Sequence, residues 1–146
     1  MSTIKTFRGR LDNLEEDRIY LAGGADNIGY KIHKFEIMGQ SPFFAESEAV
    51  MKIYTVSQAG SVDSQVDMGD ETLLGVSIST NDTDNPVNSG YRSVIFDQTV
   101  VNQDIFVTYK TNQGSEKCNY YIELEQVKIN NSEAAVMNYK AALQHT

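Results

Sequence analysis

Short runs of β-branched and aromatic residues alternate along the chain with clusters of Gly, Asn, Asp and Ser. Alternating apolar and polar side chains are typical of half-buried strands, and clusters of turn-forming residues mark where strands end. The pattern predicts eight strands, at residues 3–7, 17–22, 29–38, 48–57, 73–80, 91–96, 104–110 and 118–129. In the segment that connects the sixth and seventh strands, Val100 and Val101 predict a short additional β-pairing.

Two of these strands change the side on which their apolar residues fall. In the third strand the apolar side shifts after Ile32 to Phe35, and in the last strand it shifts after Leu124 to Val127. A change of parity is what a β-bulge produces, because one extra residue reverses the alternation. The sequence therefore predicts a bulge in the third strand and a second one near residues 125–126.

The fourth predicted strand, residues 48–57, is apolar on both faces. A strand of this kind is covered on both sides. We expect the core on one side of it and a partner on the other.

Only the C-terminal segment has the pattern of a helix, at about residues 131–143. Asn130 is a suitable N-cap, and Glu133 three residues later completes a capping box. Val136, Tyr139 and Leu143 line one face at helical spacing. A helix of this length is marginal in isolation. We expect it to lie against the edge of the sheet or against a neighbouring subunit.

About eight strands without intervening helices predict an all-β fold, an antiparallel β-sandwich of jelly-roll type with a short C-terminal helix. A closed barrel is the alternative, and the short connections exclude parallel pairing. The 146 residues suit one domain spanning residues 1–146.

The formal net charge of −8 disfavours nucleic acid as a partner, since phosphate binding depends on clustered Lys and Arg. No apolar run is long enough to cross a membrane, so no membrane partner is expected. The N-terminus lacks the apolar stretch of a secretion signal, and we therefore expect synthesis in a cytoplasm.

Residues for catalysis are few, and no enzymatic activity or cofactor is expected. His33 and His145 are the only histidines, and Cys118, the sole cysteine, is interpreted as a small buried hydrophobe. Asp82 and Asp84 are weak candidates for a calcium site, but the loop lacks the glycine and the distal glutamate of an EF-hand. Two solvated loops are the favoured interpretation of the acidic clusters, and no metal site is predicted.

A second class of function, carbohydrate or receptor binding without catalysis, stays open. Sugar-binding sheets commonly stack ligands on Trp, which is absent here. The tyrosines that are able to replace it are Tyr54, Tyr91, Tyr120 and Tyr121. Core or interface packing is the favoured role for each of them.

The order of segments along nearly the whole chain resembles a family of small virion structural proteins of marine tailed phages, of the capsid decoration or cement type. The resemblance rests on FRGRL (7–11), DRIYL (17–21), GYKIHKF (29–35), VMKIY (50–54), TLLG (72–75), VIFD (94–97), VNQDIFVT (101–108) and NYYIELE (119–125). It is one of pattern and order, and it carries no catalytic motif. Head decoration, tail tube and tail-fibre attachment all stay open, and a carbohydrate- or receptor-binding module on a tail or fibre is the alternative function.

The resemblance implies a β-sandwich that binds an assembled shell in many symmetric copies, with the major capsid protein or other virion proteins as partners. Location in the virion, after synthesis in the host cytoplasm, and a small homo-oligomer, with a trimer favoured, are the corresponding expectations. The residues expected at the contacts are Phe7, Arg8, Arg10, Tyr54, Tyr139 and Leu143.

Overall fold

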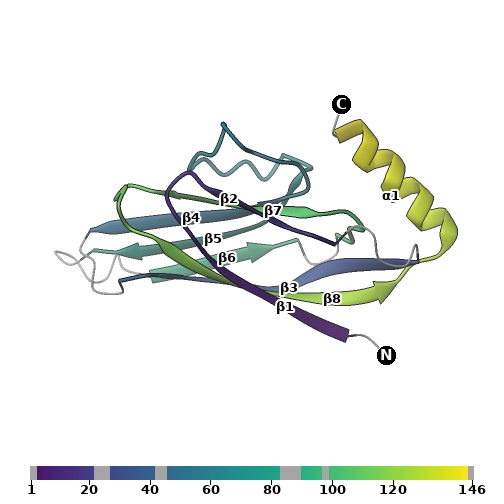
Figure 1. Ribbon diagram of the computed structural model, residues 1–146, viewed down its shortest axis with the longest axis horizontal. Coiled ribbons are helices and arrows are strands. Elements are labelled where there is room, and N and C mark those ends of the chain that lie inside the picture. Colours follow the sequence, from purple (N-terminus) through teal and green to yellow (C-terminus); the bar gives the residue numbers. More distant parts are fainter. Residues whose placement is uncertain (1–2, 22–26, 42–45, 83–89, 97–98, 145–146) are drawn as a thin grey trace.

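Two β-sheets pack face to face, and one helix stands beside the end of the sandwich (Figure 1). The computed structural model describes residues 3–21, 27–41, 46–82, 90–96 and 99–144. The elements in chain order are β1 (Thr3–Leu11), β2 (Glu16–Ile19), β3 (Ile28–Gly39), β4 (Ser47–Tyr54), β5 (Leu73–Asn81), β6 (Gly90–Ile95), β7 (Ile105–Thr111), β8 (Cys118–Lys128) and α1 (Asn131–Gln144). The predicted all-β class with a C-terminal helix is confirmed.

The three-stranded sheet has the order β1-β8-β3, and the five-stranded sheet has the order β2-β7-β4-β5-β6. Every ladder is antiparallel. Strands from the two ends of the chain lie side by side, β1 with β8 and β2 with β7, as they do in a jelly roll. The fold is thus a sandwich of two separate sheets and not a closed barrel.

Hydroxyl groups join the two sheets beside β3. The backbone C=O of Phe35 accepts hydrogen bonds from Ser77 Oγ at 2.8 Å, Tyr91 OH at 2.6 Å and Ser93 Oγ at 3.0 Å. Since β3 is an edge strand of its own sheet, polar backbone groups on it need partners outside the ladder. Side chains of β5 and β6 supply these partners and close that side of the sandwich.

The bulge predicted in the third strand is confirmed, because the register of β3 against β8 shifts between Ile32 and Lys34. The predicted extra pairing is also present, as an antiparallel bridge between Tyr30 and Val101. The second predicted bulge, near residues 125–126, is wrong. Pairing of β8 with β3 continues without a shift as far as Lys128.

The apolar residues that suggested this second bulge are Val127 and Ile129, and Ile129 lies beyond the end of β8. Its backbone N–H donates to the C=O of Asn27 at 2.8 Å as the chain turns toward α1. The side chain is 7% exposed and lies next to Gly29 of β3. A change of direction at the end of a strand therefore gives the same sequence pattern as a bulge.

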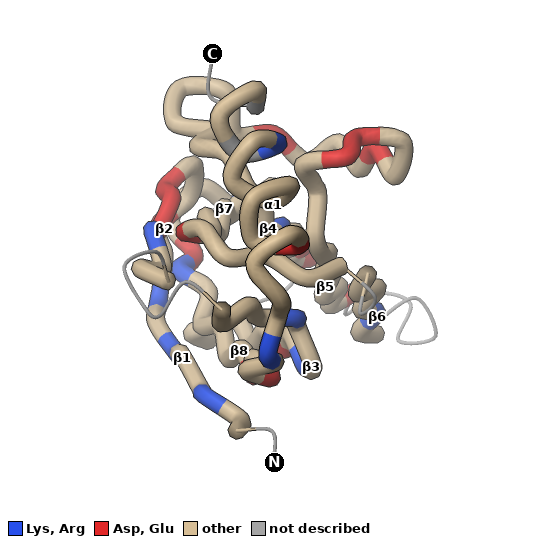
Figure 2. Tube along the Cα trace, turned by 90° about the vertical axis from the view of Figure 1, so that its right-hand side faces the viewer, with Lys and Arg blue, Asp and Glu red and all other residues tan. Residues whose placement is uncertain are grey.

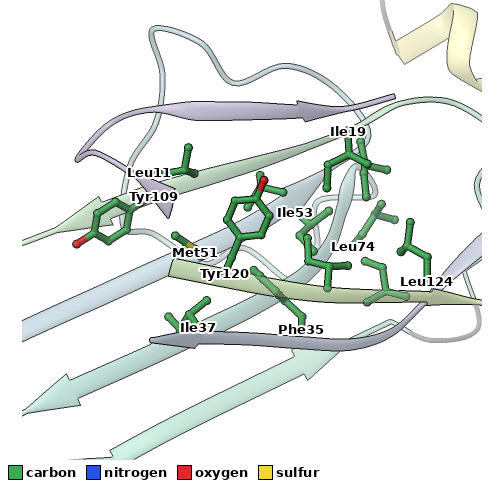
Figure 3. Packing of buried hydrophobic residues seen from close by; sticks show 14 of the residues in the cluster. Leu11, Ile19, Phe35, Ile37, Met51, Ile53, Leu74, Tyr109, Tyr120 and Leu124 are labelled. Atoms are coloured by element: carbon green, nitrogen blue, oxygen red, sulfur yellow. The ribbon is translucent and has the colours of Figure 1, made fainter. Parts of the chain in front are cut away.

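The main core fills the space between the sheets (Figure 3). Phe35 of β3 and Ile53 of β4 are almost fully buried within it. Two buried tyrosines keep partners for their hydroxyl groups: Tyr109 donates to the C=O of Glu116, and Tyr120 donates to Asp17 Oδ2, both at 2.8 Å.

Both faces of β4 are buried, but the chain itself covers the second one, which corrects the expectation of a partner there. Residues 55–72 pass over the outer face of the five-stranded sheet and are called the cover segment below (Figure 1). Lys52, only 2% exposed, donates from Nζ to Asp63 Oδ1 at 2.8 Å and to the C=O of Gln65 at 2.5 Å. A buried ammonium group thus fastens the middle of the cover segment to the sheet.

The start of the cover segment is fixed by a carboxylate of β2. Glu16 accepts hydrogen bonds from Ser57 Oγ at 2.6 Å and from the N–H of Gln58 at 2.5 Å. The end is fixed by a backbone bond from the N–H of Thr55 to the C=O of Thr72, at 2.8 Å. These three attachments hold the acidic second half of the segment in one place beside the sandwich.

Candidate docking surface

Among the described residues, the histidine and the cysteine that carry reactive groups lie apart from each other in exposure: one is on the surface and the other is in the core. His33 is exposed on β3, at the bulge, and His145 lies outside the described residues. Cys118 is fully buried, and burial raises the pKa of its thiol to about 12, which keeps it protonated and unreactive at neutral pH.

Within the described ranges, no group of three His, Cys, Asp or Glu side chains is placed to hold a metal ion. Asp82 lies just after β5, and the other half of the weak calcium candidate, Asp84, falls outside the described residues. No helix of the described chain is long and apolar enough to cross a membrane.

The four tyrosines considered for sugar stacking fall into two groups. Tyr54 and Tyr120 are 7% and 6% exposed, so their rings belong to the packed interior. Tyr91 uses its hydroxyl to bind the C=O of Phe35, and Tyr121 donates to Glu123 Oε2 at 2.9 Å. They lie on different sheets, and the structure does not gather them into one stacking platform.

The six residues expected at contacts are spread over three places. Arg8 and Arg10 are exposed on β1, whereas Phe7 is half-buried and packs against the main core. Tyr54 is covered by its own chain with Leu73 and Val76, so it is removed from the candidates for docking. The remaining two, Tyr139 and Leu143, lie on α1.

Helix α1 begins with the predicted capping box. Glu133 N–H donates to Asn130 Oδ1 at 2.8 Å, and Asn130 N–H donates back to Glu133 Oε2 at 3.1 Å. A second attachment lies further along, where Asn138 Oδ1 accepts bonds from Asn102 Nδ2 at 2.8 Å and Gln103 Nε2 at 3.1 Å. Polar contacts therefore fix the direction in which the helix leaves the sandwich.

The apolar face of α1 does not pack on the sandwich. Ala134 is 6% exposed and, with Asn138 one turn later, forms the side that meets the rest of the chain. Val136, Tyr139 and Leu143 are 54%, 67% and 57% exposed. At 3.6 residues per turn, these three lie on roughly the opposite side of the helix. We call them the apolar stripe.

Between α1 and the sandwich lies an open groove of about 830 Å³. One wall is α1 with Val136 and Met137, another is the cover segment with Met68, and the floor includes Phe96 and Val101. Asp70, Glu71, Asp104 and Glu133 also line it, against a single basic residue, Lys140. The groove is thus apolar at its base and acidic along its walls.

The sequence interpretation missed the part of this surface that the cover segment supplies. Met68 is 53% exposed on the groove wall, although the segment around it is polar. The one available signal was the apolar character of both faces of β4, since something had to cover the second face. Which segment does so depends on long-range contacts such as that of Lys52 with Asp63.

In comparisons with known proteins, no protein-family model matches the chain, and no curated protein matches it significantly.

Proposed function

We propose that the protein is a structural protein of a tailed-phage particle, a decoration or cement protein that binds the assembled shell and stabilises it through protein–protein contacts. The observation that carries the proposal is the apolar stripe of α1. A helix of 14 residues is marginal in water unless it buries an apolar face. Among its described side chains, α1 buries only Ala134. The proposal is that a shell subunit covers the stripe.

The composition of the stripe suits a protein contact. Val136 and Leu143 are aliphatic, and Tyr139 provides a large ring with a polar tip, a residue type that is frequent where binding energy is concentrated. Polar residues lie next to these positions on the helix, among them Ser132 and Lys140. An apolar centre with a polar rim is the usual anatomy of a protein interface.

The fold and charge are compatible with this function, although neither determines it. Double-sheet jelly rolls occur in viral capsid proteins and in lectins, so the fold alone does not decide between shell binding and sugar binding. The net charge of −8 favours a soluble, dispersed protein before it joins a larger assembly. The resemblance of eight ordered segments to virion proteins of marine tailed phages favours the shell.

The test is binding to shells that lack the protein. Purified protein is mixed with undecorated shells and sedimented, and the bound amount is measured over a range of protein concentrations. The wild type is expected to sediment with the shells at a fixed ratio of copies. The variant Val136→Ala/Tyr139→Ala is expected to bind at least about tenfold more weakly, since hot-spot truncations cost about 2 kcal/mol or more.

Alanine raises the helix propensity at both positions, so weaker binding by this variant is not explained by loss of α1. Leu14→Ala is the matched control, because it removes a side chain that is 53% exposed in the turn between β1 and β2. It is expected to bind as the wild type does. Absence of co-sedimentation at every salt concentration, or equal binding by all three proteins, would refute the proposal.

A further inference from the structure

The strands of the three-stranded sheet carry a charge opposite to that of the rest of the chain. The basic residues of β1, β3 and β8 are Lys5, Arg8, Arg10, Lys31, Lys34 and Lys128, and the acidic ones are Glu36, Glu123 and Glu125. Of the 12 basic and 20 acidic residues of the chain, these strands hold six and three, which leaves six and seventeen elsewhere. One sheet is therefore basic on an otherwise strongly acidic protein.

The basic charge is most available on β1. None of the five ion pairs among the described residues involves Lys5, Arg8 or Arg10. By contrast, Lys31 and Lys34 are each within 3.4 Å of a carboxylate on the same sheet. In Figure 2 the basic residues of β1 follow one another down the lower left of the view, and acidic residues gather at the upper right.

β1 is also an open edge. Its only strand partner in the described chain is β8. Ile4 on this strand is 45% exposed. An edge strand with an exposed apolar side chain readily adds another protein surface, and its positive charges select which one.

The groove beside α1 is the surface with the complementary properties. Its walls include Glu71 and Glu133, which are both exposed, and its apolar residues include Met68, which is 53% exposed, and the half-buried Met137. A basic strand with exposed apolar residues matches an acidic groove with an apolar base, both in charge and in hydrophobicity.

We infer that copies of this chain associate head to tail, with the β1 edge of one copy seated at the acidic groove of the next. A two-fold arrangement, β1 against β1, would place Arg8 and Arg10 beside their own copies and is opposed by repulsion. A head-to-tail contact pairs unlike charges at every interface. The contact repeats from copy to copy, and closure into a ring gives one discrete oligomer. The inference concerns the free protein and does not rest on shell binding.

The association is tested by measuring the molar mass of the free protein in solution. At about 0.05 M salt the wild type is expected to show one discrete oligomer that dissociates toward monomer at about 0.5 M, because salt screens the charge pairs. A monomer at every protein concentration would overturn the inference, and so would an oligomer that does not respond to salt.

Charge reversal identifies the surfaces. Arg8→Glu/Arg10→Glu inverts the edge. Glu71→Lys/Glu133→Gln removes acid from the groove while glutamine preserves the capping box. Each pair is expected to raise the dissociation constant by about tenfold or more.

The control is Arg92→Glu/Lys110→Glu, which changes the net charge by the same amount as reversal of the two arginines but on the five-stranded sheet. It is expected to leave the oligomer intact. If the control dissociates as fully as the edge variant, net charge and not the β1 edge governs association, and the inference fails. Far-ultraviolet circular dichroism of each variant distinguishes loss of association from loss of fold.

Discussion

The attachment of the cover segment to the sheet makes a sharp prediction about stability, because it depends on one buried cation. Lys52 is 2% exposed and Asp63, its carboxylate partner at 2.8 Å, is 59% exposed. Burial by itself would lower the pKa of the Lys52 ammonium, but the hydrogen bond from it to Asp63 and the nearby Tyr54 outweigh this and raise the pKa. The cation therefore stays charged and requires its acceptors.

Asp63→Ala leaves that ammonium with the C=O of Gln65 and the nearby Tyr54 as its remaining partners. Removing one partner of a fully buried pair costs about 3–5 kcal/mol. Because water reaches the exposed carboxylate of Asp63, this pair contributes less than a fully buried one. Asp63→Ala is therefore expected to lower the free energy of unfolding by about 2 kcal/mol. Lys52→Met removes the charge and keeps the volume, and it should change the free energy of unfolding by less than about 1 kcal/mol or increase it. The double variant should behave as Lys52→Met does.

Urea unfolding, followed by far-ultraviolet circular dichroism and by tyrosine fluorescence, measures these differences. The hydrogen bond from Lys52 lowers the pKa of Asp63 below its ordinary 3.8. The stabilisation is therefore present at neutral pH and is lost as the pH falls through the lowered pKa. The penalty of Asp63→Ala should accordingly shrink in strong acid. A penalty below about 0.5 kcal/mol at neutral pH, or a larger loss for Lys52→Met than for Asp63→Ala, would refute the role of the cation.

Two further predictions concern the interior. In Gly9→Ala the new Cβ would lie 2.7 Å from the hydroxyl oxygen of Tyr120, so the ring, whose hydroxyl is bonded to Asp17, must move. The free energy of unfolding, measured in urea, is expected to fall by about 1–3 kcal/mol. The control is Gly90→Ala, which has open space around its Cβ and should change that free energy by less than about 1 kcal/mol. Burial raises the pKa of Cys118 from 9.0 to about 12, so the unfolded state releases this proton at a lower pH than the folded state does. The free energy of unfolding should therefore fall as the pH rises above 9.0, and the fall should be shallower for Cys118→Ala. Rapid reaction of the native thiol with a thiol reagent at neutral pH would contradict its burial.

Much of the fold follows from local pattern. The bulge in β3 was predictable because an extra residue between Ile32 and Lys34 reverses a strong alternation. The capping box of Asn130 and Glu133 was predictable because both partners lie within one turn. In each case the residues that decide the structure are close together in the sequence.

The docking surface was predicted only in part. Helical spacing identifies Val136, Tyr139 and Leu143 as one face, but an apolar face has the same spacing whether it packs on its own domain or awaits a partner. Which of the two holds is decided by Asn138, whose bonds to residues 102 and 103 turn the opposite face inward. The groove combines segments from three distant parts of the chain, so it could not be predicted from any local sequence pattern.

The central claim is that the apolar stripe of α1 is a contact surface for another protein of the particle. A density map of an intact particle that carries the protein tests it most directly. The account predicts that Val136 and Tyr139 are covered by a neighbouring shell subunit in every symmetric copy. A map in which the chain is attached through another face, with both side chains open to solvent, would contradict it.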